Sequence, residues 1–115
     1  MSVLWGLARG TSRCFTVAGM AGVPANATAA VLNVTAVGYT TPGWLTLYPN
    51  GQLVPATSAL DFDNQFAIAN NQVLPVGASG QICVNAEMGN GVAGSSNVLI
   101  DAIGYLTGVS PLTTR

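Results

Sequence analysis

The sequence predicts an all-β fold, an antiparallel β-sandwich or jelly-roll-like domain, from three observations. Short runs of β-branched and aromatic residues alternate with polar residues, as in half-buried strands. Gly, Pro and Asn interrupt these runs about every ten residues, a spacing typical of sandwiches and barrels. No segment keeps a helical period. The chain of 115 residues fits one domain, which we place at residues 1–108, followed by a tail at 109–115.

The breaks along the chain delimit the expected strands in order. Gly10 separates the first two apolar runs, and a Gly- and Pro-containing stretch at 19–24 precedes the third. The third and fourth runs alternate clearly on either side of 40–43. Later runs are bounded by 49–51, by 63–65, by 77–80 and by 89–96. The expected strands are therefore 3–8, 12–18, 28–37, 44–48, 58–62, 72–76, 81–85 and 97–106.

Two of these segments share a pattern. Residues 31–39 and 98–105 are both hydrophobic, carry a lone polar group and end in Gly-Tyr, so we expect neighbouring central strands. The run 97–106 is apolar on both faces apart from Asp101, as in a strand covered on both sides. It would lie between two layers or against another subunit. A buried carboxylate needs a partner, and we expect Arg13, Arg9 or backbone N–H groups to supply it.

Charge is scarce in this chain. Only 6% of residues are charged, with no Lys or His, whereas about 25% is typical. Three scattered Arg residues cannot form the basic footprint of a nucleic-acid protein. No apolar run approaches the ~20 residues of a membrane span. Weak repulsion between copies favours a homo-oligomer, with a neutral extracellular domain as the alternative.

The two cysteines, Cys14 and Cys83, lie in strand-like runs at 12–18 and 81–87, and each directly precedes a hydrophobic residue. Their spacing and the absence of His exclude a usual zinc site. Each could be a free buried thiol. We favour a disulfide between them and hence an oxidising compartment.

Several motifs occur in one order: Val-Pro-Ala-Asn-Ala-Thr-Ala from Val23, Val-Leu-Asn-Val-Thr-Ala from Val31, Gly-Trp-Leu-Thr-Leu-Tyr-Pro from Gly43, Ser-Ala-Leu-Asp-Phe at 58–62, Val-Gly-Ala-Ser-Gly-Gln from Val76, and Asp-Ala-Ile-Gly-Tyr at 101–105. Over residues 13–106 the chain resembles a β-rich module of about one hundred residues in secreted proteins of actinobacteria and other bacteria. That module often lies C-terminal to proteases, amidases and glycosidases, or in tandem. The resemblance implies a secreted accessory module without catalytic residues. Residues 4–10 depart from the family's usual Asp-Thr-Arg opening.

Catalytic chemistry is restricted by composition. Without His or Lys, the chain cannot build Ser-His-Asp, Cys-His or Ser-Lys machinery. Asp61, Asp63 and Asn64 form the only acidic cluster. We expect it to be a turn whose side chains cap backbone N–H groups. The alternatives are a calcium site and a glycosidase acid pair.

Aromatic residues offer a second candidate site. Tyr39, Trp44 and Tyr48 could form a platform for sugar rings, since Tyr39 and Trp44 flank one turn and would lie at one end of a hairpin. The alternative is that Trp44 and Tyr48 fill the core, as large aromatic residues usually do.

These observations favour a non-catalytic extracellular module that binds a carbohydrate or cell-surface polymer, or copies of itself. A small carboxylate-dependent hydrolase, with calcium as its possible cofactor, is one alternative. A structural protomer of a fibre or adhesin is another. Residues 1–7 lack a signal-peptide pattern, so we expect the chain to begin after such a signal or to belong to a longer protein.

Overall fold

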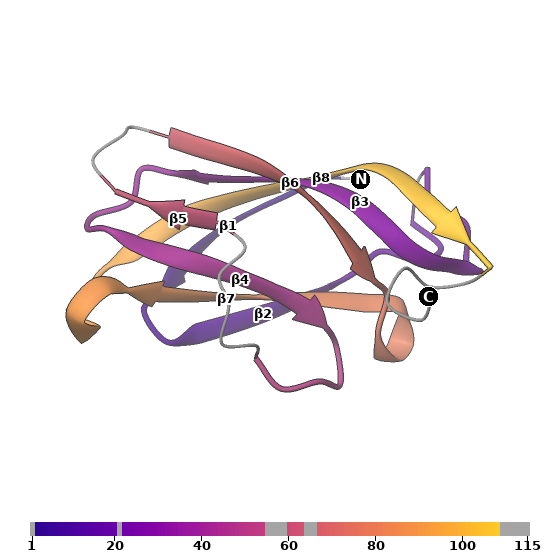
Figure 1. The fold of residues 1–115 in the computed structure, drawn as a ribbon, viewed down its shortest axis with the longest axis horizontal. Helices are drawn as coiled ribbons and strands as arrows, with labels where there is room; N and C mark the ends of the chain where they lie inside the picture. Colours follow the sequence, from indigo (N-terminus) through magenta and orange to yellow (C-terminus); the bar gives the residue numbers. More distant parts are fainter. Residues whose placement is uncertain (1, 21, 55–59, 64–66, 109–115) are drawn as a thin grey trace, which may run out of the picture.

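Eight strands form two four-stranded antiparallel sheets in the computed structural model, which describes residues 2–20, 22–54, 60–63 and 67–108. In spatial order, sheet A contains β1 (Ser2–Ala8), β8 (Ser95–Thr107), β3 (Ala27–Val37) and β6 (Ala67–Pro75). Sheet B contains β2 (Thr11–Thr16), β7 (Gln81–Met88), β4 (Gly43–Pro49) and β5 (Leu60–Phe62). The two sheets pack face to face (Figure 1). The predicted all-β sandwich is confirmed.

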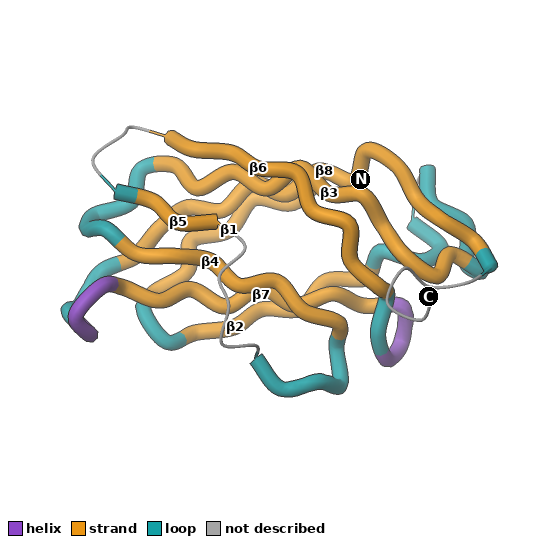
Figure 2. The backbone as a smooth tube through the Cα atoms, viewed as in Figure 1, coloured by secondary structure: helices purple, strands orange, loops and turns teal. Residues whose placement is uncertain are grey.

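The order of the strands is that of a jelly roll. Consecutive strands cross from one sheet to the other at every described connection except the one between β4 and β5. The short 3₁₀ turns Ala78–Gly80 and Gly89–Gly91 lie at opposite ends of the sandwich (Figure 2). No helix within the described ranges is long and apolar enough to cross a bilayer.

The core lies between the sheets and follows from alternation along most of each central strand, interrupted by register shifts between β3 and β8 near Thr28 and Val31. Every second residue points inward from Ala30 to Ala36 of β3 and from Val98 to Ala102 of β8, and the corresponding residues of β4 and β7 meet them from sheet B. The fully buried large side chains of this core include Leu32, Val34, Leu45, Phe62, Ile82, Val84, Val98 and Ile100. The expected pairing of the two strands with the shared Gly-Tyr ending is also confirmed, because β3 and β8 are antiparallel neighbours at the centre of sheet A.

An aromatic cluster covers one edge of the core, between β1 and β2, which are the edge strands of the two sheets on the same side. The Trp5 and Phe15 rings meet edge to face with centroids 5.4 Å apart. The Arg13 guanidinium carbon lies 4.8 Å from the Trp5 ring centroid, a cation–π contact. Arg13 therefore covers the edge of the core.

The outer face of sheet A corrects the expectation for Asp101. Neither Arg13 nor Arg9 pairs with this carboxylate; instead, the Ser2 hydroxyl donates a hydrogen bond to Asp101 Oδ1. The register explains the difference, since Ser2 lies opposite Asp101 and alternation turns both away from the core. Asp101 is only partly buried, so it does not need an ionic partner.

Candidate functional site

The candidate site lies on the outer face of sheet B, where the register brings three side chains into one row. Trp44 on β4 is directly opposite Asp61 on β5 and directly opposite Glu87 on β7. Residues opposite each other on paired antiparallel strands project from the same face of a sheet. Since Leu45 and Leu47 of β4 enter the core, Trp44 projects outward. We call Asp61, Trp44 and Glu87 the Trp44 row.

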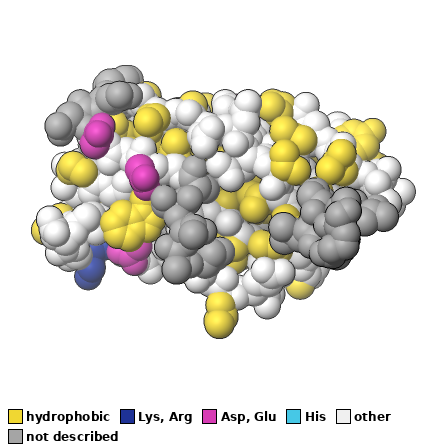
Figure 3. Space-filling model, viewed as in Figure 1, with side chains coloured by type: hydrophobic (Ala, Val, Ile, Leu, Met, Phe, Trp, Pro, Cys, Tyr) yellow, Lys and Arg dark blue, Asp and Glu magenta, His cyan; other side chains and the backbone are white. Residues whose placement is uncertain are grey.

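The Trp44 row is accessible to a ligand. Trp44 and Glu87 are partly exposed and Asp61 is exposed. Neither carboxylate makes a hydrogen bond or ion pair with another described residue. Figure 3 shows acidic side chains gathered around a hydrophobic patch at one end of the molecule, on the side where β4 and β5 lie in Figure 1. This arrangement offers an apolar ring between two hydrogen-bond acceptors.

Tyr48 also projects from the outer face of sheet B, yet it is not accessible in the same way. It lies opposite Cys83, four residues along β4 from Trp44, and its side chain is only 7% exposed. Between them Thr46 is 3% exposed. Tyr48 is therefore buried opposite the disulfide-bonded Cys83, and of the two β4 aromatics only Trp44 is partly exposed.

Tyr39 lies apart from Trp44. The expected hairpin was wrong, because β3 belongs to sheet A and β4 to sheet B, so the turn between them crosses the end of the sandwich. The Tyr39 ring packs against the core with its centroid 4.5 Å from that of Phe62. Its hydroxyl is buried without a hydrogen-bond partner among the described residues. The structure thus brings Tyr39 to the core and Trp44 to the surface.

The predicted disulfide between Cys14 and Cys83 is confirmed. It joins directly opposite residues of β2 and β7 on the outer face of sheet B. Cys14 is exposed, while Cys83 is 1% exposed. The bond ties the short edge strand β2 to the centre of the sheet.

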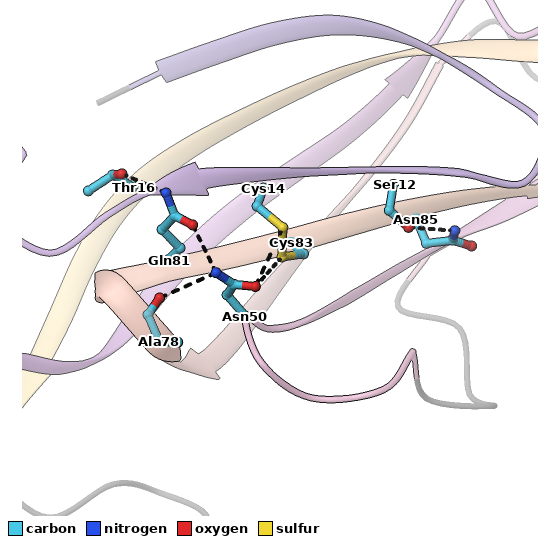
Figure 4. Close-up of a disulfide and its surroundings, with 8 residues drawn as sticks. All are labelled: Ser12, Cys14, Thr16, Asn50, Ala78, Gln81, Cys83 and Asn85. Atoms are coloured by element: carbon cyan, nitrogen blue, oxygen red, sulfur yellow. Dashed lines mark hydrogen bonds between the residues drawn. A yellow bond between two sulfur atoms is a disulfide. The ribbon is translucent and has the colours of Figure 1, made fainter.

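Asn50 extends this tie to the end of β4 (Figure 4). Its amide nitrogen donates to Gln81 Oε1 at 2.9 Å and to the Ala78 carbonyl at 3.5 Å. Gln81 Nε2 in turn donates to Thr16 Oγ1 at 3.1 Å. Asn50 Oδ1 lies 3.7 Å from Cys83 Sγ and 3.9 Å from Cys14 Sγ. These last two are packing contacts, because a disulfide sulfur carries no hydrogen to donate.

The acidic cluster is described only in part. Asp61 lies in β5 and Asp63 follows the strand, both exposed, whereas Asn64 lies outside the described residues. Among the described residues, no three His, Cys, Asp or Glu side chains gather in a way that could hold a metal ion. Calcium binding and a glycosidase role at Asp61 and Asp63 stay predictions.

Glu87 is the member of the row that sequence reasoning missed. Alternation along β7 does place Cys83, Asn85 and Glu87 on one face. Only the pairing of β7 with β4, two strands far apart in sequence, brings Glu87 beside Trp44. Asn85 is in the adjacent row, where its amide donates to Ser12 Oγ at 2.8 Å.

Comparison of the chain with protein-family models, with curated proteins and with solved structures finds no match.

Proposed function

We propose that this chain is a non-catalytic, extracellular module that binds a carbohydrate polymer on the outer face of sheet B. The observation that carries the proposal is the partly exposed Trp44 ring between two carboxylates that have no hydrogen-bond or ion-pair partner among the described residues. The jelly roll alone supports no function, because one fold serves many.

Carbohydrate suits this row on chemical grounds. The C–H faces of a pyranose ring pack on an indole, which combines a large apolar surface with a rigid shape. Sugar hydroxyls donate hydrogen bonds, and carboxylate oxygens accept charge-assisted ones. Asp61 and Glu87 lie on the strands either side of Trp44, about 4.8 Å away on each side in the pairing direction. A sugar lying on Trp44 is therefore within reach of both.

The disulfide supports the extracellular part of the proposal. Disulfides persist in secreted and periplasmic proteins and are rare in reducing compartments. The Cys14–Cys83 bond leaves no free cysteine in the described chain. The resemblance to secreted accessory modules points in the same direction.

The Trp44→Ala variant is expected to lose binding while keeping its fold. Removing the central aromatic of a small interface typically weakens binding about tenfold or more. Affinity electrophoresis against a panel of soluble polysaccharides measures the change, with circular dichroism to check the fold. Tyr105→Ala is the matched control, because Tyr105 is a 46% exposed aromatic on β8 of the opposite sheet. Equal retardation of wild type and Trp44→Ala on every retarding polymer would contradict the proposal.

Self-association is a second candidate function, favoured by the outer face of sheet A. One row of that face runs through Leu4, Leu99, Thr35 and Ala69, and Leu4 is 65% exposed. Asp101 is the one charged residue in the four strands of sheet A, and it accepts a hydrogen bond from Ser2. Two copies could thus pack this face against itself in a two-fold dimer with little charge at the interface.

This second proposal predicts a dimer at micromolar concentration that Leu4→Arg and Leu99→Arg both convert to a monomer. Either arginine would place a charge in the buried centre of the interface. Sedimentation velocity reports the mass, with Leu53→Arg as control because Leu53 is 92% exposed and lies in the β4–β5 connection. A wild-type chain that sediments as an 11.6 kDa monomer would rule out this dimer.

A further inference from the structure

The Trp44 row contains two acidic side chains and no basic one. Asp61 and Glu87 flank the indole, and Asp63 lies two residues after Asp61, just beyond the end of β5. No basic side chain belongs to β4, β5 or β7. A neutral sugar on Trp44 would offer hydroxyl donors to the two carboxylates but no positive charge, whereas a cationic sugar would supply both.

Neither Arg9 nor Arg13 forms an ion pair with this row, although Figure 3 shows a basic side chain beside an acidic one at this end of the molecule. Arg13 is engaged with Trp5 at the β1 and β2 edge. Arg9 lies in the β1–β2 turn, where its Nη1 atom is 3.7 Å from the position of a Cβ added to Gly91. Arg9 forms no ion pair with Glu87, although the neighbouring Gly10 lies close to the Glu87 carboxylate. Among the described residues, neither carboxylate of the row is therefore held in a hydrogen bond or an ion pair.

From these charges we infer that the ligand of the Trp44 row carries a protonated primary amine, and that its class is a polymer of free amino sugars. This inference rests on the carbohydrate-binding proposal and specifies its substrate class. An ammonium group gains from the indole face by the cation–π interaction and donates N–H hydrogen bonds to flanking carboxylates. The sugar ring that carries the amine packs its C–H face on the same indole.

The number of aromatic rings argues for a primary amine over a quaternary one. Quaternary ammonium groups have no N–H to donate and are held in cages of several aromatic rings. The row has one ring and two acceptors. This composition matches a group with three N–H donors.

The test compares a soluble oligomer of β-1,4-linked glucosamine with its fully N-acetylated counterpart, by isothermal titration calorimetry on the whole chain. We expect the free amine to bind at least about tenfold more tightly at low salt, and to lose this advantage as salt screens the charges. Asp61→Asn and Glu87→Gln should each weaken binding of the glucosamine oligomer about threefold to fivefold. They should weaken binding of the N-acetylated oligomer much less, because it loses only hydroxyl hydrogen bonds there.

Asp101→Asn is the matched control. It removes the same charge from the outer face of the other sheet and keeps an oxygen that accepts from Ser2. A response equal to that of Asp61→Asn would mean that net charge, not the Trp44 row, causes the effect, and would overturn the inference.

Three further outcomes also overturn it, and they are distinguishable. Equal binding of both oligomers through Trp44 would refute the amine while leaving carbohydrate binding intact. Binding of neither would count against both proposals. An oligolysine peptide that binds more tightly than the glucosamine oligomer, with the same loss in Trp44→Ala, would reassign the row to basic peptides.

Discussion

Removal of the disulfide, by Cys14→Ser combined with Cys83→Ala, is expected to lower the melting temperature by about 15 °C. The bond closes a loop with a sequence separation of 69, and in the chain-entropy model such a loop contributes about 4 kcal/mol. The loss of stability should be largest in β2, because this strand has six residues, lies at the edge of sheet B and pairs only with β7 in that sheet. Serine suits the exposed Cys14 position and alanine the buried Cys83 position.

Thermal unfolding followed by circular dichroism measures this effect, and a reductant provides the control. Wild type in reductant should melt near the double variant, whereas the double variant should not respond to reductant at all. A double variant that melts within about 3 °C of the oxidised wild type would show that the sheet does not depend on this bond.

Gly43→Ala is expected to destabilise the fold by about 3 kcal/mol, at the upper end for overpacking a core. A Cβ at Gly43 would overlap the Glu87 carbonyl oxygen and approach Met88 Cα and Phe62 Cζ to 3.0 Å. Glu87 O and Met88 Cα are backbone atoms of β7. They cannot shift away without breaking hydrogen bonds between β4 and β7. The residue next in sequence is Trp44, so the close approach at Gly43 also fixes where the row lies.

Gly6→Ala is the matched control, since Gly6 is likewise a strand glycine, in β1. Its added Cβ meets only Asn97 Oδ1, at 3.4 Å. Urea denaturation should place the midpoint of Gly6→Ala near that of wild type and the midpoint of Gly43→Ala far below it. Equal midpoints for the two variants would contradict the close approach.

Local patterns were sufficient to predict the strands. Each of the eight expected ranges has a counterpart, although residues 58–59 and the expected tail at 109–115 lie outside the described residues. Boundaries differed most at β6, expected at 72–76 and observed at Ala67–Pro75. The sequence Ala-Ile-Ala-Asn-Asn at its start combines weak strand formers with residues that favour turns. Pairing with β3 along nine residues overrides these preferences.

Nonlocal pairing limited what the sequence could predict about the site. Trp44 and Asp61 were singled out from composition and turn signals, yet their adjacency comes from the pairing of β4 with β5. The separation of Tyr39 from Trp44 depends on a crossing between sheets that no local pattern contains. Glu87 became visible only once β7 was placed beside β4. The jelly-roll topology, rather than any motif, assembles the row.

The most direct test of the Trp44 row as a carbohydrate site is an NMR titration of the wild-type chain with soluble oligosaccharides. The chain has two tryptophans, and their indole N–H signals report two different places. We predict that the Trp44 signal shifts together with the backbone amides of Asp61 and Glu87. The Trp5 signal should stay fixed, because that ring is covered by Arg13 and packed on Phe15. A saturating oligosaccharide that leaves the Trp44 signal unmoved, or that shifts only residues of sheet A, would contradict the proposed site.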